Sequence, residues 1–69
     1  MNYNQDSIIS NLAQAIEWTS DAIWKNAMRK QYSNFPKEDI LQSIAWAKER
    51  IQTAMEGMEQ FEKDLHNQQ

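Results

Sequence analysis

The residues of this chain best suited to chemistry are two tryptophans that have cations close to them. Trp46 lies four residues before Arg50, and Trp18 precedes Lys25 and Arg29 by about two and three helical turns. On a helix each ring therefore shares a face with its cations. Such a pair can anchor a protein interface, or it can stack on a nucleotide base and neutralise a phosphate. The structural alternative is a tryptophan on the rim of a helical core with a local cation–π contact.

The single glycine of the chain, Gly57, continues the face that carries Trp46 and Arg50. A glycine inside a helix costs about 1 kcal/mol relative to alanine. Close approach by another backbone or by a ligand would explain that cost. We therefore predict a partner-binding face, and its residues are Trp18, Lys25, Arg29, Trp46, Arg50 and Gly57.

Enzymatic chemistry has weak support in the sequence, because catalysis requires converging titratable groups or a bound metal. Glu17 and Asp21 lie four residues apart, and so do Glu62 and His66. Di-iron bundles place the histidine three residues after the glutamate, and these carboxylates belong to polar helix faces. Cysteine, glycine-rich phosphate loops and nucleophile elbows are absent from the sequence. We predict no enzyme, no metal site and no cofactor, and a carboxylate metalloenzyme ranks last among the candidate functions.

Length and charge restrict the class of partner. The 69 residues predict one domain, 1–69, and a chain this short buries only about 60% of its unfolded surface. Without cysteine for disulfides, association is the remaining way to reinforce such a core. The net charge of −3 disfavours nucleic acid, which binds through neutralised phosphates. The lack of a long apolar stretch or a signal-like segment predicts a cytoplasmic protein that does not enter membranes.

Apolar residues recur at helical spacing on both sides of the segment 32–36, which predicts two helices. We expect the first helix over about residues 6–31 and the second over about residues 35–65, with a frayed tail at 66–69. A linker this short predicts that the two helices lie antiparallel as a hairpin.

The expected helix starts carry residues that favour them. Asp6 or Ser7 can cap the first helix by accepting a hydrogen bond from a free amide of the first turn. Ser33 or Asn34 can cap the second helix in the same way, and Pro36 suits the first turn because its missing amide costs nothing there.

A row of mostly apolar residues runs along the second helix with alternating spacings of four and three. Its members are Ile40, Ile44, Ala47, Ile51, Ala54, Met58, Phe61 and Leu65. We expect this seam to pack against the first helix through Ile9, Leu12, Ile16 and Ile23. Apolar flanks remain outside that contact, so the predicted fold is all-α, a long antiparallel hairpin that dimerises into a four-helix bundle. A parallel trimer or a complex with another protein is the alternative assembly.

The segment from Ala47 to Met55 reads AKERIQTAM. Its pattern consists of Lys48, Ile51, Gln52, Thr53, Ala54 and Met55. On these positions the segment resembles the second helix of phage-encoded helical-hairpin proteins that sequester cyclic nucleotide signals of bacterial immunity. Those proteins are sponges that counter CBASS and Thoeris defences. The resemblance implies an oligomeric sponge that binds its ligand between protomers without catalysis.

These observations favour a small non-enzymatic protein that binds a protein partner through an exposed helix face, such as an inhibitor or regulator encoded by a phage or mobile element. The expected partners are a second copy of the chain, as a homodimer, and another protein. The alternative is a sponge for a cyclic nucleotide, with aromatic rings for stacking and Lys25, Arg29 or Arg50 for the phosphates.

Overall fold

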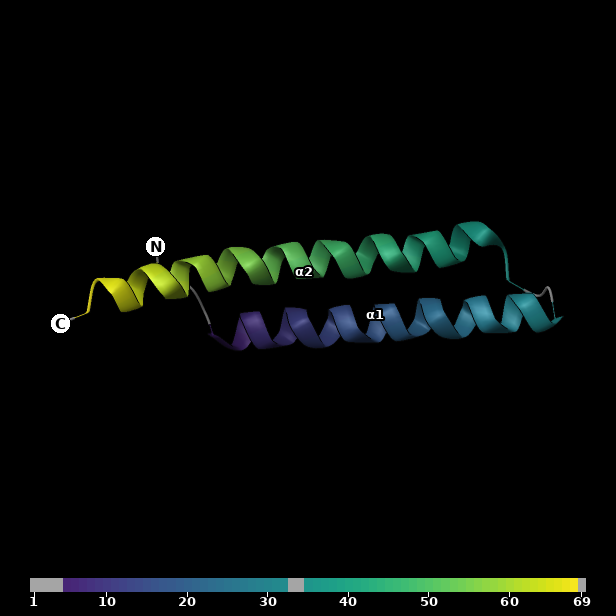
Figure 1. Cartoon of the computed structure of the whole chain (residues 1–69), viewed down its shortest axis with the longest axis horizontal. Helices are drawn as coiled ribbons and strands as arrows, with labels where there is room; N and C mark the ends of the chain where they lie inside the picture. The colour runs from purple at the N-terminus through teal and green to yellow at the C-terminus, as the bar shows by residue number, and fades with distance from the viewer. Residues whose placement is uncertain (1–4, 33–34, 69) are drawn as a thin grey trace.

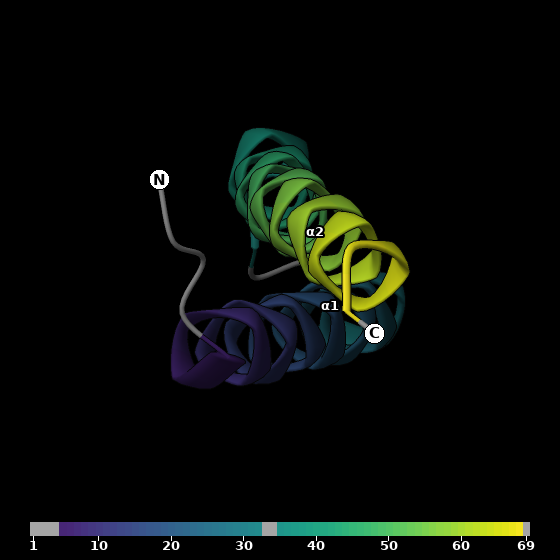
Figure 2. The same ribbon diagram turned by 90° about the vertical axis from the view of Figure 1, so that its left-hand side faces the viewer.

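The computed structural model describes residues 5–32 and 35–68, and it contains two long α-helices. Helix α1 spans Gln5–Tyr32 and helix α2 spans Lys37–His66. The two helices lie side by side and antiparallel along the 58 Å length of the molecule (Figure 1). Seen from the end, they are stacked one on the other with a slight crossing (Figure 2). The predicted all-α helical hairpin is therefore confirmed.

The start of α1 differs from the sequence prediction. Because the helix begins at Gln5, both Asp6 and Ser7 lie inside its first turn. The Asp6 carboxylate is therefore placed near the positive end of the helix dipole. At the other end, Arg29 and Lys30 lie in the last turn, where cations interact favourably with the negative end.

A proline immediately precedes helix α2, one residue before the first turn in which the sequence prediction placed it. The predicted caps Ser33 and Asn34 lie outside the described residues. Pro36 occupies the N-cap position with an extended backbone, φ −63° and ψ 145°, and makes no side-chain capping bond. Its carbonyl accepts a hydrogen bond of 3.1 Å from the amide of Asp39. At the far end the helix continues to His66, and the amide of Asn67 donates to the Lys63 carbonyl at 3.1 Å.

The buried part of the contact between α1 and α2 consists mainly of small and polar side chains, and we call it the inner seam. Its buried members are Asn11, Ala15 and Ala22 of α1 and Ile40, Ser43, Ala47 and Ala54 of α2. Among the described residues, Ile40 is the one large apolar side chain that is buried. Small side chains let two helix backbones approach closely, so the hairpin is narrow, 14 Å across each short dimension.

The inner seam differs from the contact that the sequence suggested. Ala47 and Ala54 do face α1, and Phe61 is half-buried, but Ile44, Ile51, Met58 and Leu65 are exposed. On α1 the expected row of Ile9, Leu12, Ile16 and Ile23 is exposed as well. The reason is the rotation of α1 about its own axis. Helix α1 presents the neighbouring row of smaller side chains to α2, and the aliphatic row lies to one side of the contact.

Candidate interaction surface

Large aliphatic side chains line one side of the hairpin, along the boundary between α1 and α2. We call this surface the apolar face, and it consists of Ile9, Leu12, Ile16 and Ile23 of α1 with Ile44, Ile51 and Met58 of α2. Between 38% and 67% of each of these residues is exposed. Because they recur at three-, four- and seven-residue spacings, they form ridges of the kind that pack into the grooves of another helix.

Three hollows follow one another along the apolar face. The middle hollow, of about 400 Å³, is lined by Leu12, Ala15, Ile16, Thr19, Ser20 and Ile51. The hollow toward the loop, of about 420 Å³, is lined by Thr19, Ala22, Ile23, Asn26, Ile40 and Ile44. The hollow toward the open end, of about 280 Å³, is lined by Gln5, Ile8, Ile9, Met58 and Phe61. Thr19 lines both the middle hollow and the hollow toward the loop, so these two form one shallow groove, and the third hollow follows it toward the open end.

The predicted partner-binding residues lie elsewhere, and most of them contact the other helix of the same hairpin. The rings of Trp18 and Trp46 lie 4.5 Å apart, centroid to centroid, at an interplanar angle of 50°. Arg50 donates from Nη1 to Oδ1 of Asn11 at a long 3.5 Å. These side chains therefore connect α1 to α2, although 42% of Trp46 is still exposed.

Of the remaining members of that predicted set, Gly57 contacts the other helix and Lys25 pairs within its own helix. The Nζ atom of Lys25 lies 3.0 Å from Oδ2 of Asp21 on its own helix. Gly57 faces Ile8, and a Cβ atom at position 57 would lie 2.7 Å from Cγ1 of Ile8. A close approach at Gly57 therefore exists, but it is made by a side chain of α1 and not by another backbone or a ligand. Arg29 is exposed in the last turn of α1.

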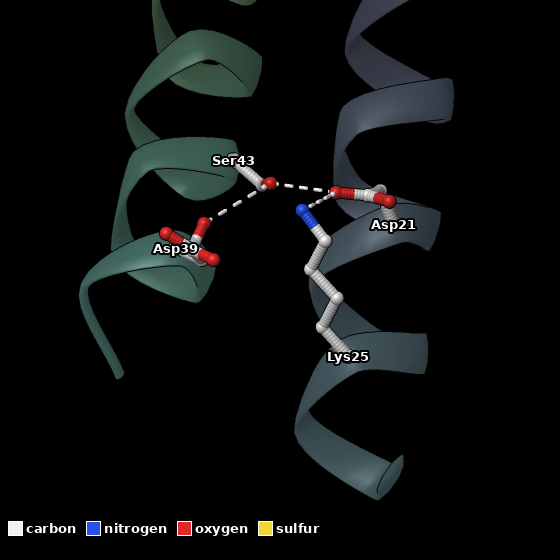
Figure 3. A network of polar contacts seen from close by, with 4 residues as sticks. All are labelled: Asp21, Lys25, Asp39 and Ser43. Atoms are coloured by element: carbon white, nitrogen blue, oxygen red, sulfur yellow. Dashed lines mark hydrogen bonds and ion pairs between the residues drawn. The ribbon is translucent and has the colours of Figure 1, made fainter. Parts of the chain in front are cut away.

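A polar contact crosses the inner seam near the loop end (Figure 3). Ser43 is fully buried, and its hydroxyl donates to Oδ2 of Asp21 at 2.7 Å. The Asp39 carbonyl lies 3.3 Å from the same hydroxyl, but one proton serves one acceptor at a time, and the shorter contact to a charged oxygen is the stronger. The hydrogen bond from Ser43, followed by that from Lys25, lowers the pKa of Asp21 below its ordinary value of 3.8.

Sequence reasoning missed the α1 side of the inner seam, although a signal for it is present. Asn11, Ala15, Trp18 and Ala22 repeat at spacings of four, three and four, like the aliphatic row beside them. Two neighbouring rows of the same period can each face a partner helix, and hydrophobicity favours the larger residues. In the structure the row through Ala15 and Ala22 faces α2, and the aliphatic row beside it is exposed.

In the described ranges 5–32 and 35–68, no group of three or more histidine, aspartate or glutamate side chains could hold a metal ion. Neither helix, over its described residues, is long and apolar enough to cross a membrane. Comparisons with protein-family models, with curated proteins and with solved structures found no match. The apolar face is thus the feature on which a functional proposal has to rest.

Proposed function

We propose that this protein is a non-catalytic interaction protein whose apolar face packs against helices of another protein chain. The observation that carries the proposal is the position of its large aliphatic residues, which are exposed along one groove while alanines occupy the inner seam. Covering a Val, Leu, Ile, Phe or Met side chain is worth about 1.5–3 kcal/mol when burial is complete. Seven such residues in one face therefore provide a large driving force for association.

The shape of the groove supports a helical occupant. It follows the boundary of two straight helices, and its ridges repeat at the i, i+3, i+4 and i+7 positions that helix-in-groove recognition uses. The side chains of a helix in this groove would have the same spacing as the ridges that they meet. An inhibitor or regulator that acts by docking needs no further chemistry than this.

The test compares two variants that carry the same charge change on different sides of the hairpin. Ile16→Glu places a carboxylate in the middle of the apolar face, and Ala45→Glu places one at an exposed position of α2 outside that face. Sedimentation velocity should show that Ile16→Glu abolishes association while Ala45→Glu retains it, because an unpaired buried charge is costly. If the wild type associates and both variants associate equally well, the proposal is contradicted.

A second candidate follows from the resemblance to cyclic nucleotide sponges. In its favour, Lys48, Gln52, Thr53 and Met55 are exposed on α2 and are therefore accessible to a ligand. Trp18, Lys25 and Arg50 already have partners within the hairpin, so a nucleotide would have to bind between protomers. A sponge should show a higher melting temperature with cyclic dinucleotides or cyclic ADP-ribose isomers, since ligand binding to the folded state stabilises it. An unchanged melting temperature across this panel contradicts the sponge and leaves the first proposal intact.

A further inference from the structure

The apolar face has an end-to-end symmetry in the spacing of its residues. On α1, Ile9, Ile16 and Ile23 follow one another at seven-residue intervals, and on α2 the same intervals separate Ile44, Ile51 and Met58. Each interval corresponds to about 10.5 Å along a helix. The two middle residues, Ile16 and Ile51, line the same hollow. The pattern therefore reads nearly the same from either end of the hairpin.

A surface of this kind is complementary to itself. If a second hairpin is turned end for end about an axis through the middle hollow, Ile51 meets Ile51 and Ile44 meets Met58. On the other helix, Ile16 meets Ile16 and Ile9 meets Ile23. This is the arrangement of an isologous two-fold interface, in which the same patch is used by both copies.

The exposed area of the chain agrees with an interface of that size. The accessible surface is 5533 Å², whereas a globular monomer of 8.2 kDa exposes about 4,500 Å². The excess is about 1,000 Å², and a standard stable interface buries about 800 Å² on each partner. One second copy on the apolar face would bring the chain to the exposed area expected for its mass.

Charge distinguishes between the two possible orientations of the second copy. All charged side chains lie in the described residues, so the hairpin can be divided at Ile16 and Ile51. The loop half, residues 17–50, contains six cations and five anions, a net charge of +1. The open half, residues 5–15 and 52–68, contains one cation and five anions, a net charge of −4.

In the other orientation, which we call parallel, the loops of the two hairpins lie at the same end. Large residues again meet large ones, because Ile16 then meets Ile51 and Ile9 meets Met58. The parallel orientation would, however, set the two open halves against each other, −4 beside −4. The end-for-end arrangement sets −4 beside +1 at both ends and avoids that repulsion, an effect that salt weakens.

We infer that the occupant of the apolar face is a second copy of this chain in the end-for-end orientation, so that the loop half of each hairpin lies against the open half of the other. This inference rests on the proposed function, because it names the chain against which the apolar face packs. The product is an antiparallel four-helix bundle whose core consists of the apolar faces of two copies.

The test measures distances between spin labels by double electron–electron resonance on single-cysteine variants of the full chain, which has no cysteine of its own. Gln31→Cys labels the loop end at an exposed, uncharged position, and Gln52→Cys labels an exposed position beside the centre of the groove. In the end-for-end dimer the two labels at position 31 are about 45 Å apart, fifteen residues on each side of Ile16. The two labels at position 52 are much closer together.

A long distance at position 31 with a short distance at position 52 supports the inference. Short distances at both positions identify a parallel dimer and overturn the orientation. A monomeric mass at high micromolar concentration, without dipolar coupling at either position, overturns the second copy altogether.

Failure of the inference can be separated from failure of the proposed function with an apolar dye. If the wild type is monomeric and Ile16→Glu abolishes dye binding while Ala45→Glu does not, the face remains available to another protein and only the second copy is excluded. If the wild type is monomeric and all three bind the dye alike, the proposed function fails as well. In the dimer, Ile16→Glu should weaken self-association on the order of 100-fold or more.

Discussion

The two long surfaces of this hairpin that run between its helices differ in the size of their side chains. The inner seam is lined mainly by alanine with polar residues between, and it brings the helix backbones close together. The apolar face lies directly beside it and carries isoleucine, leucine and methionine that the hairpin leaves exposed. Tight packing and large apolar area are thus divided between two surfaces, whereas an ordinary core combines them. The seam sets the geometry of the hairpin, and the face presents large aliphatic side chains for association.

The largest effect is expected where a large side chain is placed in the inner seam. Ala54 is fully buried, so Ala54→Leu forces the helices apart and should reduce the free energy of unfolding by about 3 kcal/mol. The control, Ile51→Leu, alters an exposed residue of the apolar face at constant volume and should change stability by less than about 1.5 kcal/mol. Urea unfolding followed by circular dichroism measures both. Equal effects would show that the two surfaces do not differ as described.

A smaller effect is expected at the glycine that accommodates Ile8. In an Ile8→Ala background, Gly57→Ala should stabilise the hairpin by about 1 kcal/mol, because alanine favours the helix and meets no obstacle. In the wild-type background the new Cβ would lie 2.7 Å from Cγ1 of Ile8, so the same substitution should gain less or destabilise.

A double-mutant cycle measured by thermal unfolding gives the coupling between positions 8 and 57. Additive effects would mean that Ile8 moves away without cost. The contact between the helices would then be tight at the alanines of the inner seam and loose at its open end.

The smallest effect is expected from pH. Because the pKa of Asp21 is lowered in the folded state, its contribution to stability is present above the ordinary value of 3.8 and is lost as pH falls through the folded value. The stability difference between wild type and Ser43→Ala should therefore shrink as pH falls below 3.8 and through the folded value, because protonation of Asp21 weakens in wild type a bond that the variant lacks at every pH.

The matched control for this measurement is Ser10→Ala, which removes an exposed hydroxyl that contacts Gln14 and no carboxylate. Its difference from wild type should not depend on pH. A pH-independent difference for Ser43→Ala as well would indicate that Ser43 contributes through packing and not through Asp21.

The helices, their antiparallel order and the placement of Ala47 and Ala54 against α1 could be read from spacing and a short linker. The choice between the two rows of α1 could not, because the aliphatic row and the row through Ala15 and Ala22 have the same period. Hydrophobicity favours the first row, while close backbone approach favours the second. The spacing of residues in one sequence does not reveal how closely two helix backbones approach, so this second effect could not be predicted.

The contacts between individual residues of α1 and α2 could not be predicted from the sequence for a different reason. Trp18 and Trp46 could be recognised as unusual, but their contact depends on the register of α1 against α2. So do the contact of Gly57 with Ile8 and the hydrogen bond from Ser43 to Asp21. Register depends on the geometry of the connection, and helical periodicity carries no information about it.

Both sides of the inner seam carry alanines at a seven-residue interval, Ala15 and Ala22 on α1 and Ala47 and Ala54 on α2. Such a repeat specifies the alignment of two helices weakly, because it presents small side chains of the same size at each interval. The hydrogen bond from Ser43 to Asp21 and the contact of Gly57 with Ile8 each occur in one register. These two contacts therefore give the pairing of α1 with α2 a uniqueness that its alanines do not supply.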